Sequence, residues 1–212
     1  LYINKKGEII AGAYQGLSIF NEKNNNFENY SFSNTSAGNV SITAIYQTSD
    51  NDAEIYWLAT SDGLLKFNRN NKTFEVFRIE ENEIYNFQAN NLASIVEDNN
   101  GVLWIGTPNG IAMFNPKTNT FYPSSYVLTF NKSLIDKKII VGYVDDAGII
   151  WLSIDKEGIL KYDAQINKFN LYKHDPFNPL SLPNGIVQGG YQNEDLTLWI
   201  ATSQHGFCLL YT

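Results

Sequence analysis

The chain has 212 residues, a net charge of −7 and a pI near 4.8, and aromatic residues make up 14% of it. An acidic chain with arginine only at Arg69 and Arg78 lacks the basic face that binds nucleic acid, so we expect no nucleic-acid partner. The single cysteine, Cys208, cannot form an intrachain disulfide. No apolar run approaches the roughly 18 residues that span a bilayer, so we expect no direct membrane insertion by this segment.

Five similar segments follow one another along the chain. A glycine recurs at steps of 47, 47, 48 and 48 residues, at Gly16, Gly63, Gly110, Gly158 and Gly206. A large apolar residue keeps almost the same period, at Ile10, Trp57, Trp104, Trp151 and Trp199. A fixed period of this length indicates a repeat architecture.

The third segment shows most clearly what one repeat contains. Residues 93–98 and 102–107 read as strands separated by an Asn-Asn-Gly turn, and Asn109-Gly110 is a strong hairpin signal before a third strand at 111–114. A polar turn then leads to a fourth strand that begins at 120–122. Four short antiparallel strands per repeat are typical of one propeller blade.

The sequence therefore predicts an all-β fold, a β-propeller of four-stranded antiparallel blades with repeats of ~47 residues. Its 212 residues form a single, partial propeller domain with about five blades, at residues 1–40, 41–90, 91–137, 138–185 and 186–212, the last incomplete. Five blades could close a ring, but propellers of this repeat length more often have about six to eight. We therefore expect further blades in a longer parent chain.

Each segment pairs a large residue with a small one on the same strand face. Two residues after the positions of the tryptophans stand Gly12, Ala59, Gly106, Ser153 and Ala201. Residues i and i+2 of a strand share a face, so a projecting ring lies beside a gap that admits the neighbouring blade. The pattern predicts that the tryptophans are packing residues.

Three stretches resemble a known family. They are residues 101–111 (GVLWIGTPNGI), 114–121 (FNPKTNTF) and 172–182 (YKHDPFNPLSL). They are similar to the two-component regulator propeller repeats found in the periplasmic sensor half of hybrid two-component histidine kinases, mostly from Bacteroidetes. The first segment departs from that pattern with Ile10 in place of tryptophan.

The resemblance implies a function that composition and spacing do not show. The parent would be an inner-membrane protein with a periplasmic sensor region and a cytoplasmic histidine kinase, and it would act as a homodimer. Its ligand would be an oligosaccharide, and its output would control glycan-utilisation genes. The segment itself would be non-catalytic and would need no cofactor.

Candidate ligand residues come from the end of the blades that carries the long links between them. The residue before each recurring glycine is polar, and together these residues could ring the mouth of a central channel: Gln15, Asp62, Asn109, Glu157 and His205. Sugar hydroxyls could bind there, although Asn and Asp also suit an ordinary solvated turn. We call these five the turn residues.

The long links add aromatic residues that could stack on sugar rings. Those without a regular counterpart in the other repeats are the candidates: Tyr85, Phe87, Tyr126, Phe130 and Phe177. The alternative is that they fix the links onto the blades. Aromatic residues at matching repeat positions, Tyr30, Phe77, Tyr122 and Tyr172, are expected to pack instead.

Catalysis has little support in the sequence. His174 falls within the linker pattern of the family that it resembles, where packing explains it, and His205 lies in a turn with no metal ligands at useful spacing. We therefore expect no metal site and no catalytic residue. The acidic pairs at 97–98 and 145–146 fall in short turns at the end opposite the long links. Two alternatives to a binding propeller remain: a propeller lyase or glycoside hydrolase, and a structural propeller that transmits dimer geometry.

Overall fold

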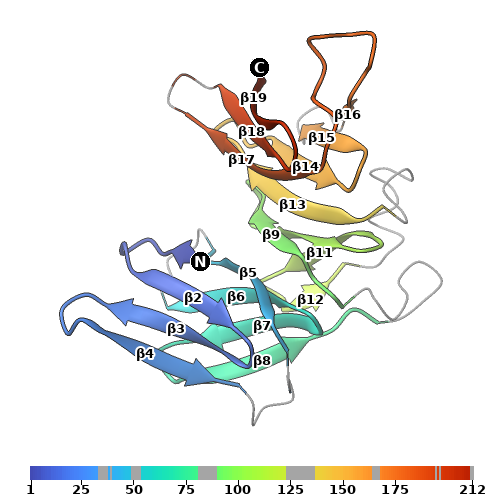
Figure 1. Ribbon diagram of the computed structural model, residues 1–212. Coiled ribbons are helices and arrows are strands. Elements are labelled where there is room, and N and C mark those ends of the chain that lie inside the picture. The colour runs from blue at the N-terminus through green and yellow to red at the C-terminus, as the bar shows by residue number, and fades with distance from the viewer. Residues whose placement is uncertain are drawn as a thin grey trace.

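The structure is a computed structural model that describes residues 1–32, 38, 40–48, 54–80, 90–122, 137–163, 168–193, 195 and 197–210. These residues form 19 strands and include no helix long and apolar enough to cross a membrane. Figure 1 shows the strands as five sheets that follow one another along the chain.

The strands of each sheet are consecutive in sequence and lie side by side in the same order. The first sheet holds β1 (Tyr2–Ile3), β2 (Ile9–Ala13), β3 (Gly16–Asn21) and β4 (Asn26–Ser31). The second holds β5 (Ile42–Tyr46), β6 (Ile55–Thr60), β7 (Gly63–Asn68) and β8 (Thr73–Phe77). The third holds β9 (Ser94–Glu97), β10 (Leu103–Thr107), β11 (Gly110–Asn115) and β12 (Thr120–Phe121).

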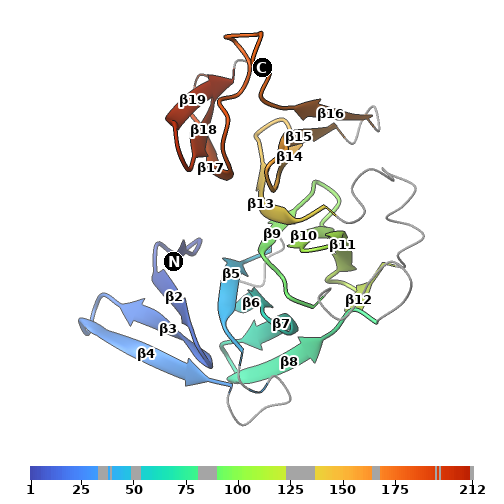
Figure 2. The ribbon, with the colours of Figure 1, turned by 45° about the vertical axis from the view of Figure 1, so that its right-hand side comes forward.

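The fourth sheet holds β13 (Ile139–Val144), β14 (Ile150–Ile154), β15 (Gly158–Asp163) and β16 (Lys168–Tyr172). The fifth holds β17 (Val187–Gln192), β18 (Leu198–Thr202) and β19 (Gly206–Leu210). All strand pairs within these sheets are antiparallel, which confirms the predicted fold class. Successive sheets meet mainly through their first strands, and Figure 2 shows β5, β9, β13 and β17 along the inner side of the curve.

The recurring tryptophans lie between sheets. Trp57 of the second sheet is 1% exposed, and its ring centroid lies 5.0 Å from that of Phe114 in the third sheet. Trp104 of the third sheet is 3% exposed and lies 4.9 Å from Tyr162 in the fourth. Large aromatic rings bury much apolar area, so these contacts hold neighbouring sheets together.

The exposure of the tryptophan at this repeat position differs between the fourth and fifth sheets. Trp151 of the fourth sheet is 4% exposed and packs in one cluster with Leu198 of the fifth sheet. Trp199 of the fifth sheet is 39% exposed. The packing role predicted for the tryptophans is confirmed where a following sheet is present.

The small residue beside each tryptophan position leaves room for the next sheet. A Cβ added at Gly106 would lie 2.8 Å from the carbonyl oxygen of Ile139, the first residue of β13, and 2.7 Å from the Ser94 hydroxyl. A Cβ at Gly12 would lie 2.7 Å from the Ile42 side chain of the second sheet. Both distances are too short for a real Cβ, so the predicted alternation of large and small residues is a packing requirement.

A pair of glycine variants tests this requirement. Gly106→Ala is expected to lower the free energy of unfolding by about 1–3 kcal/mol, because the added methyl group overpacks the contact with the fourth sheet. Gly189→Ala is the matched control, since an added Cβ there meets nothing within 4 Å. It is expected to stabilise the chain by about 0.4–1 kcal/mol by restricting the unfolded state. Urea denaturation measures both, and similar effects for the two variants would contradict the account.

An aspartate organises the short turn between the first and second strands. The Asp98 carboxylate accepts backbone N–H groups from Asn100 at 2.8 Å and Val102 at 3.0 Å, and the Trp104 indole N–H at 3.0 Å. Asp145 makes the same set of bonds in the fourth sheet, including one of 2.8 Å from the indole of Trp151. One member of each acidic pair seen in the sequence therefore fixes a turn and orients a tryptophan.

Candidate functional site

The turn between the second and third strands of a sheet lies beside the link to the next sheet. In the first sheet the backbone N–H of Gln15 donates to the Val40 carbonyl at 2.9 Å. In the second sheet the Gly63 N–H donates to the Asn90 carbonyl at 2.7 Å. The long links and the turn residues therefore share one end of the sheets, as the sequence predicted.

A threonine outside the predicted site residues holds this turn in three of the sheets. The Thr60 hydroxyl donates to the Gly63 carbonyl at 2.7 Å and accepts the backbone N–H of Asp62 at 3.2 Å. Thr107 and Thr202 make the same two bonds in the third and fifth sheets. The signal was present as a threonine three or four residues before the recurring glycine.

The turn residues sit one strand outward from the inner edge of their sheets, because the first strand of each sheet is innermost. Asp62 makes an ion pair with Arg78 at 2.9 Å, and Glu157 makes one with Lys137. His205 and Asp62 are exposed, and Gln15, Asn109 and Glu157 are half-buried. Two of the five side chains are thus already paired with a cation, and the role of all five in ligand binding stays a prediction.

The link that joins the fourth and fifth sheets, residues 173–186, is built by its own hydrogen bonds. The Ser181 hydroxyl accepts the Asp175 N–H at 2.9 Å and donates to the Asp175 carbonyl at 3.0 Å. A ring nitrogen of His174 lies 2.9 Å from the Leu182 carbonyl. This contact ties the exposed His174 to the link, and the loop presents Phe177, which is 96% exposed, to solvent.

A hollow of about 360 Å³ opens between this link and the outer edge of the fifth sheet. Its apolar wall comes from Leu171, Leu182 and Leu209, and Tyr172 lies beside them. Polar groups face it from the link: Lys173, Asp175, Asn178 and Ser181. A concave surface with an aromatic ring, apolar walls and a few polar groups has the composition of a small-ligand site. We call it the link hollow.

Aromatic residues at matching repeat positions pack, as predicted. The Tyr30 ring lies 4.9 Å from that of Phe67, and the Phe77 ring lies 5.2 Å from that of Phe114. Tyr172 lies 6.0 Å from Trp151. Among the irregular aromatic residues only Phe177 is described; the others lie outside the described residues: Tyr85, Phe87, Tyr126 and Phe130.

Two further titratable groups, Tyr46 and Glu97, meet at the contact between the second and third sheets. Glu97 is buried in β9 and accepts the Tyr46 hydroxyl of the second sheet at 3.2 Å. Burial and the nearby Glu97 carboxylate raise the pKa of Tyr46 well above its usual range. Cys208 is half-buried beside the link hollow, and burial raises its pKa, so its thiol is not poised to ionise.

Both arginines pair with carboxylates. Arg69, between β7 and β8, contacts Glu8 at 2.8 Å and Glu28 at 3.1 Å in the first sheet, and Glu54 at 3.7 Å in its own. Arg78 pairs with Asp62 as described above. Arg69 therefore acts as a clamp between the first two sheets.

This clamp predicts a pH dependence of stability. Burial raises the pKa of Glu8, but hydrogen bonds from Arg69 and Asn4 outweigh it and hold the pKa below its ordinary value of 4.5. Hydrogen bonds from Tyr30, Asn21 and Arg69 lower the pKa of Glu28 in the same direction. A carboxylate whose pKa is lowered by folding stabilises the fold when the pH lies above its unfolded-state pKa. This contribution is lost as the pH falls through the folded-state pKa.

Arg69→Met is therefore expected to lower stability most near neutral pH, and the difference from the unmodified chain is expected to shrink as the pH falls below 4.5, the ordinary pKa of these glutamates. Urea denaturation across that range measures the difference, with Lys23→Met, on the exposed β3–β4 turn, as the control that stays flat. A pH-independent difference would show that Arg69 acts only through packing.

The third sheet carries the match to a family model. The model, described as two component regulator propeller, matches residues 86–109, which contain β9 and β10. The match covers 24 of the 212 residues. The matched residues overlap the stretch at 101–111 on which the resemblance rested. The chain has no match among curated proteins.

Solved propellers share this repeat-by-repeat fold. Two are extracellular domains of proteins described as hybrid two component systems, both from B. thetaiotaomicron. One matches 98% of this chain at a TM-score of 0.73 and 20% identity, and the other matches 95% at 0.75 and 21%. This chain spans 26% and 25% of those two chains, and identities this low show the shared fold alone.

A virginiamycin B lyase from Staphylococcus aureus has a similar fold. The match covers 100% of this chain and 68% of the lyase chain, at a TM-score of 0.67 and 13% identity. The two extracellular domains match with the higher TM-scores and identities.

Proposed function

We propose that this chain is a non-catalytic, extracytoplasmic ligand-binding propeller of a hybrid two-component signalling protein, and that it responds to oligosaccharides. The observation that carries the proposal is the match to the two component regulator propeller model at residues 86–109, together with the likeness to the extracellular domains of two hybrid two component systems over nearly the whole chain. The output we propose is control of glycan-utilisation genes by a cytoplasmic histidine kinase in an inner-membrane, homodimeric parent.

The link hollow supports ligand binding of this kind. Sugars bind where an aromatic or apolar surface receives the ring and nearby polar groups hold the hydroxyls. Tyr172 and Leu182 offer the aromatic and apolar surface, and Lys173 and Asn178 offer the polar groups. Phe177 stands on the same link but does not line the hollow.

The domain organisation proposed from the repeats accompanies this function. The sheets would form a rigid body, and the links between them would vary. The proposed blades are residues 1–40, 41–90, 91–137, 138–185 and 186–212. Binding residues commonly lie on loops that a rigid scaffold positions. The link hollow lies at the junction of the last two proposed blades.

A thermal-shift screen with xylohexaose, arabinohexaose and a chondroitin disaccharide tests the proposal. One of these probes is expected to raise the unfolding temperature, because a ligand that binds only the folded state stabilises it. Lys173→Ala and Asn178→Ala are expected to weaken that probe about tenfold each, which corresponds to about 1.4 kcal/mol. Lys117→Ala, an exposed residue between β11 and β12, is the control that leaves binding unchanged.

The screen also separates the two alternatives. No shift with any probe would contradict a sugar-binding propeller. A thermal shift that is unchanged in both link-hollow variants would show that the ligand binds elsewhere. The link would then have a structural role. Release of shorter sugars during the incubation, followed by chromatography, would favour the lyase or hydrolase suggested by the fold shared with virginiamycin B lyase.

A further inference from the structure

The turn between the second and third strands is one residue longer in the fourth and fifth sheets than in the others. The first three sheets have two-residue turns, at 14–15, 61–62 and 108–109. The fourth and fifth sheets have three-residue turns, at 155–157 and 203–205. The two extra residues account for the two 48-residue steps between the recurring glycines. The repeat therefore departs from its own pattern at the two turns that flank one link, residues 173–186.

Both longer turns lie against this link. A Cβ added at Gly158 would lie 3.0 Å from the Lys173 Cα at the start of the link. A Cβ added at Gly185, near the end of the link, would lie 3.8 Å from the Nδ1 atom of His205. The fourth-sheet turn also holds Lys156 in the left-handed region, at a φ of 61°, which is uncommon for a residue with a side chain. The longer turns thus bring a lysine and a histidine to the link from two different sheets.

A second, smaller hollow opens between the fourth-sheet turn and the link. Its polar groups come from Lys156, Glu157, His174 and Asn184, and Leu182 lines both this hollow and the link hollow. Its volume is about 20 Å³, which is room for one group of the size of a water molecule. A carboxylate or sulfate oxygen fits such a space, whereas a sugar ring does not. We call it the turn hollow.

Successive residues at the start of the link line different hollows. Lys173 and Asp175 line the link hollow, and His174 between them lines the turn hollow. The Nδ1 atom of His174 lies 2.9 Å from the Leu182 carbonyl oxygen, which can only accept, so Nδ1 carries the hydrogen of this bond. The Nε2 atom is then the ring nitrogen left for a ligand. The link is therefore the common wall of the two hollows.

The cations at these hollows are uncommitted, while the acids beside them are paired. Neither Lys156 nor Lys173 makes an ion pair or a hydrogen bond with the described part of the chain. Glu157 is paired with Lys137, and the Asp175 carboxylate accepts a backbone N–H of the link at 2.9 Å. A hydrated ammonium group with no partner attracts anions. The local charge is thus available for an anion, although the whole chain has a net charge of −7.

We propose that the turn hollow is an anion subsite, and that the oligosaccharide bound at the link carries a carboxylate or a sulfate group. Lys156 supplies the positive charge, and His174 and His205 add ring donors when they are protonated. The inference rests on the proposed function and narrows its ligand class to acidic sugars. Of the three probes in the thermal-shift screen, only the chondroitin disaccharide, which carries a carboxylate, is then expected to bind.

Two matched pairs of sugars test the proposal by calorimetric titration of the 212-residue chain. Trigalacturonate is compared with its methyl ester to test the carboxylate, and neocarrabiose 4-sulfate with neocarrabiose to test the sulfate. The acidic member of at least one pair is expected to bind about tenfold more tightly than its neutral partner, and the pair that responds identifies the group. Added salt is expected to reduce this preference, because it screens exposed charges.

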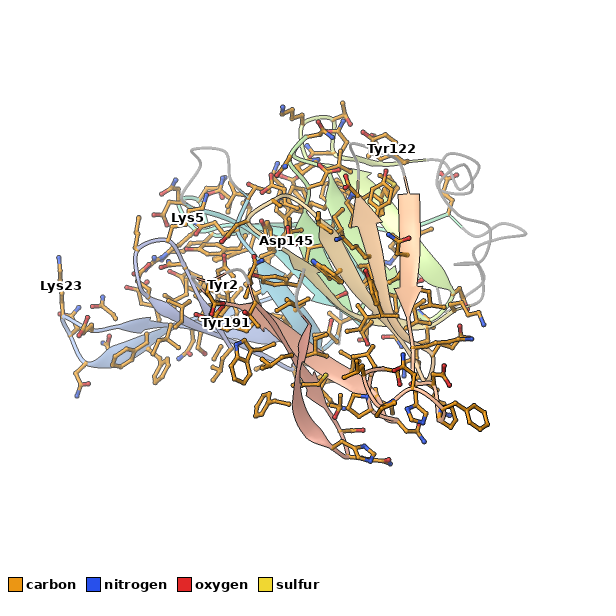
Figure 3. The ribbon with its side chains drawn as sticks, turned by 90° about the horizontal axis from the view of Figure 1, so that it is seen from above. Tyr2, Lys5, Lys23, Tyr122, Asp145 and Tyr191 are labelled. Atoms are coloured by element: carbon orange, nitrogen blue, oxygen red, sulfur yellow. The ribbon has the colours of Figure 1, made fainter. Side chains whose placement is uncertain are left out.

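Lys156→Gln is expected to abolish most of the preference for the acidic sugar. Glutamine already adopts the left-handed region at Gln15, with a φ of 64°, so the variant keeps the turn. His205→Gln is expected to cause a smaller loss in the same direction. Lys72→Gln is the matched control, because Lys72 is exposed and has a φ of 59° in the turn between β7 and β8. Lys23→Gln is a second control, at the outer tip of the first sheet and away from the fourth and fifth sheets in Figure 3.

The possible results separate this inference from the proposed function. Binding of xylohexaose, arabinohexaose or a neutral pair member as tight as that of the acidic sugars would overturn the anion subsite and leave a sugar-binding propeller. A preference for acidic sugars that Lys156→Gln does not change would also overturn it, because the anion would then be recognised elsewhere. Absence of binding by every sugar, neutral or acidic, would contradict the proposed function together with this inference.

Discussion

Replacing Trp57 with alanine is expected to lower the free energy of unfolding by about 3–5 kcal/mol. Trp57 is 1% exposed and contacts Phe77 of its own sheet and Phe114 of the next, with ring centroids 5.9 and 5.0 Å apart. The substitution removes buried apolar area and leaves a cavity between two sheets that collapse only in part. Urea denaturation followed by far-ultraviolet circular dichroism measures the loss.

Trp199→Ala is the internal control for this prediction. Trp199 occupies the same repeat position but is 39% exposed, so it has less area to lose, and we expect a loss of about 1 kcal/mol or less. Equal losses at the two positions would show that the tryptophan stabilises its own sheet rather than the contact with the next one.

Asp145→Ala is expected to produce the second largest effect, a loss of about 2–4 kcal/mol. Its carboxylate accepts two backbone N–H groups of the short turn and the Trp151 indole N–H at 2.8 Å, and its side chain is buried. Alanine leaves these donors without their acceptor in a place that water reaches poorly. Chemical denaturation gives the loss, and near-ultraviolet circular dichroism reports the environment of the tryptophan.

Two variants separate the hydrogen bonds from other effects of this change. Asp146→Ala removes the neighbouring, exposed acid of the same pair and is expected to change stability by no more than about 0.5 kcal/mol. Asp145→Asn keeps an oxygen acceptor and is expected to recover part of the loss. An asparagine variant as unstable as the alanine variant would show that the negative charge, rather than the turn geometry, is what the fold requires.

The fold could be predicted because its main contact repeats in sequence. Strand periodicity and the recurring pair of Trp57 or Trp104 with a small residue two positions later define both the sheets and their packing. The exposure of Trp199 followed from no local signal, since its neighbours in sequence match those of Trp151. Exposure depends on whether another sheet lies against the face, which a repeat pattern alone does not specify.

The candidate site was harder to predict, for a physical reason. Comparing repeats reveals what the scaffold requires, whereas a ligand site depends on side chains that come together from different segments. The link hollow joins Lys173 and Asn178 of a link with Leu209 of β19, which are far apart in any repeat alignment.

Isothermal titration calorimetry of the 212-residue chain with the same three sugars tests the central claim most directly, because one experiment reports binding and turnover together. The account predicts saturable heats for one sugar, with one site per chain, a flat baseline between injections, and recovery of the sugar intact. Continuing heat with cleaved sugar would contradict the non-catalytic assignment. The absence of saturable heat with every sugar would contradict the claim that these sheets carry the ligand site.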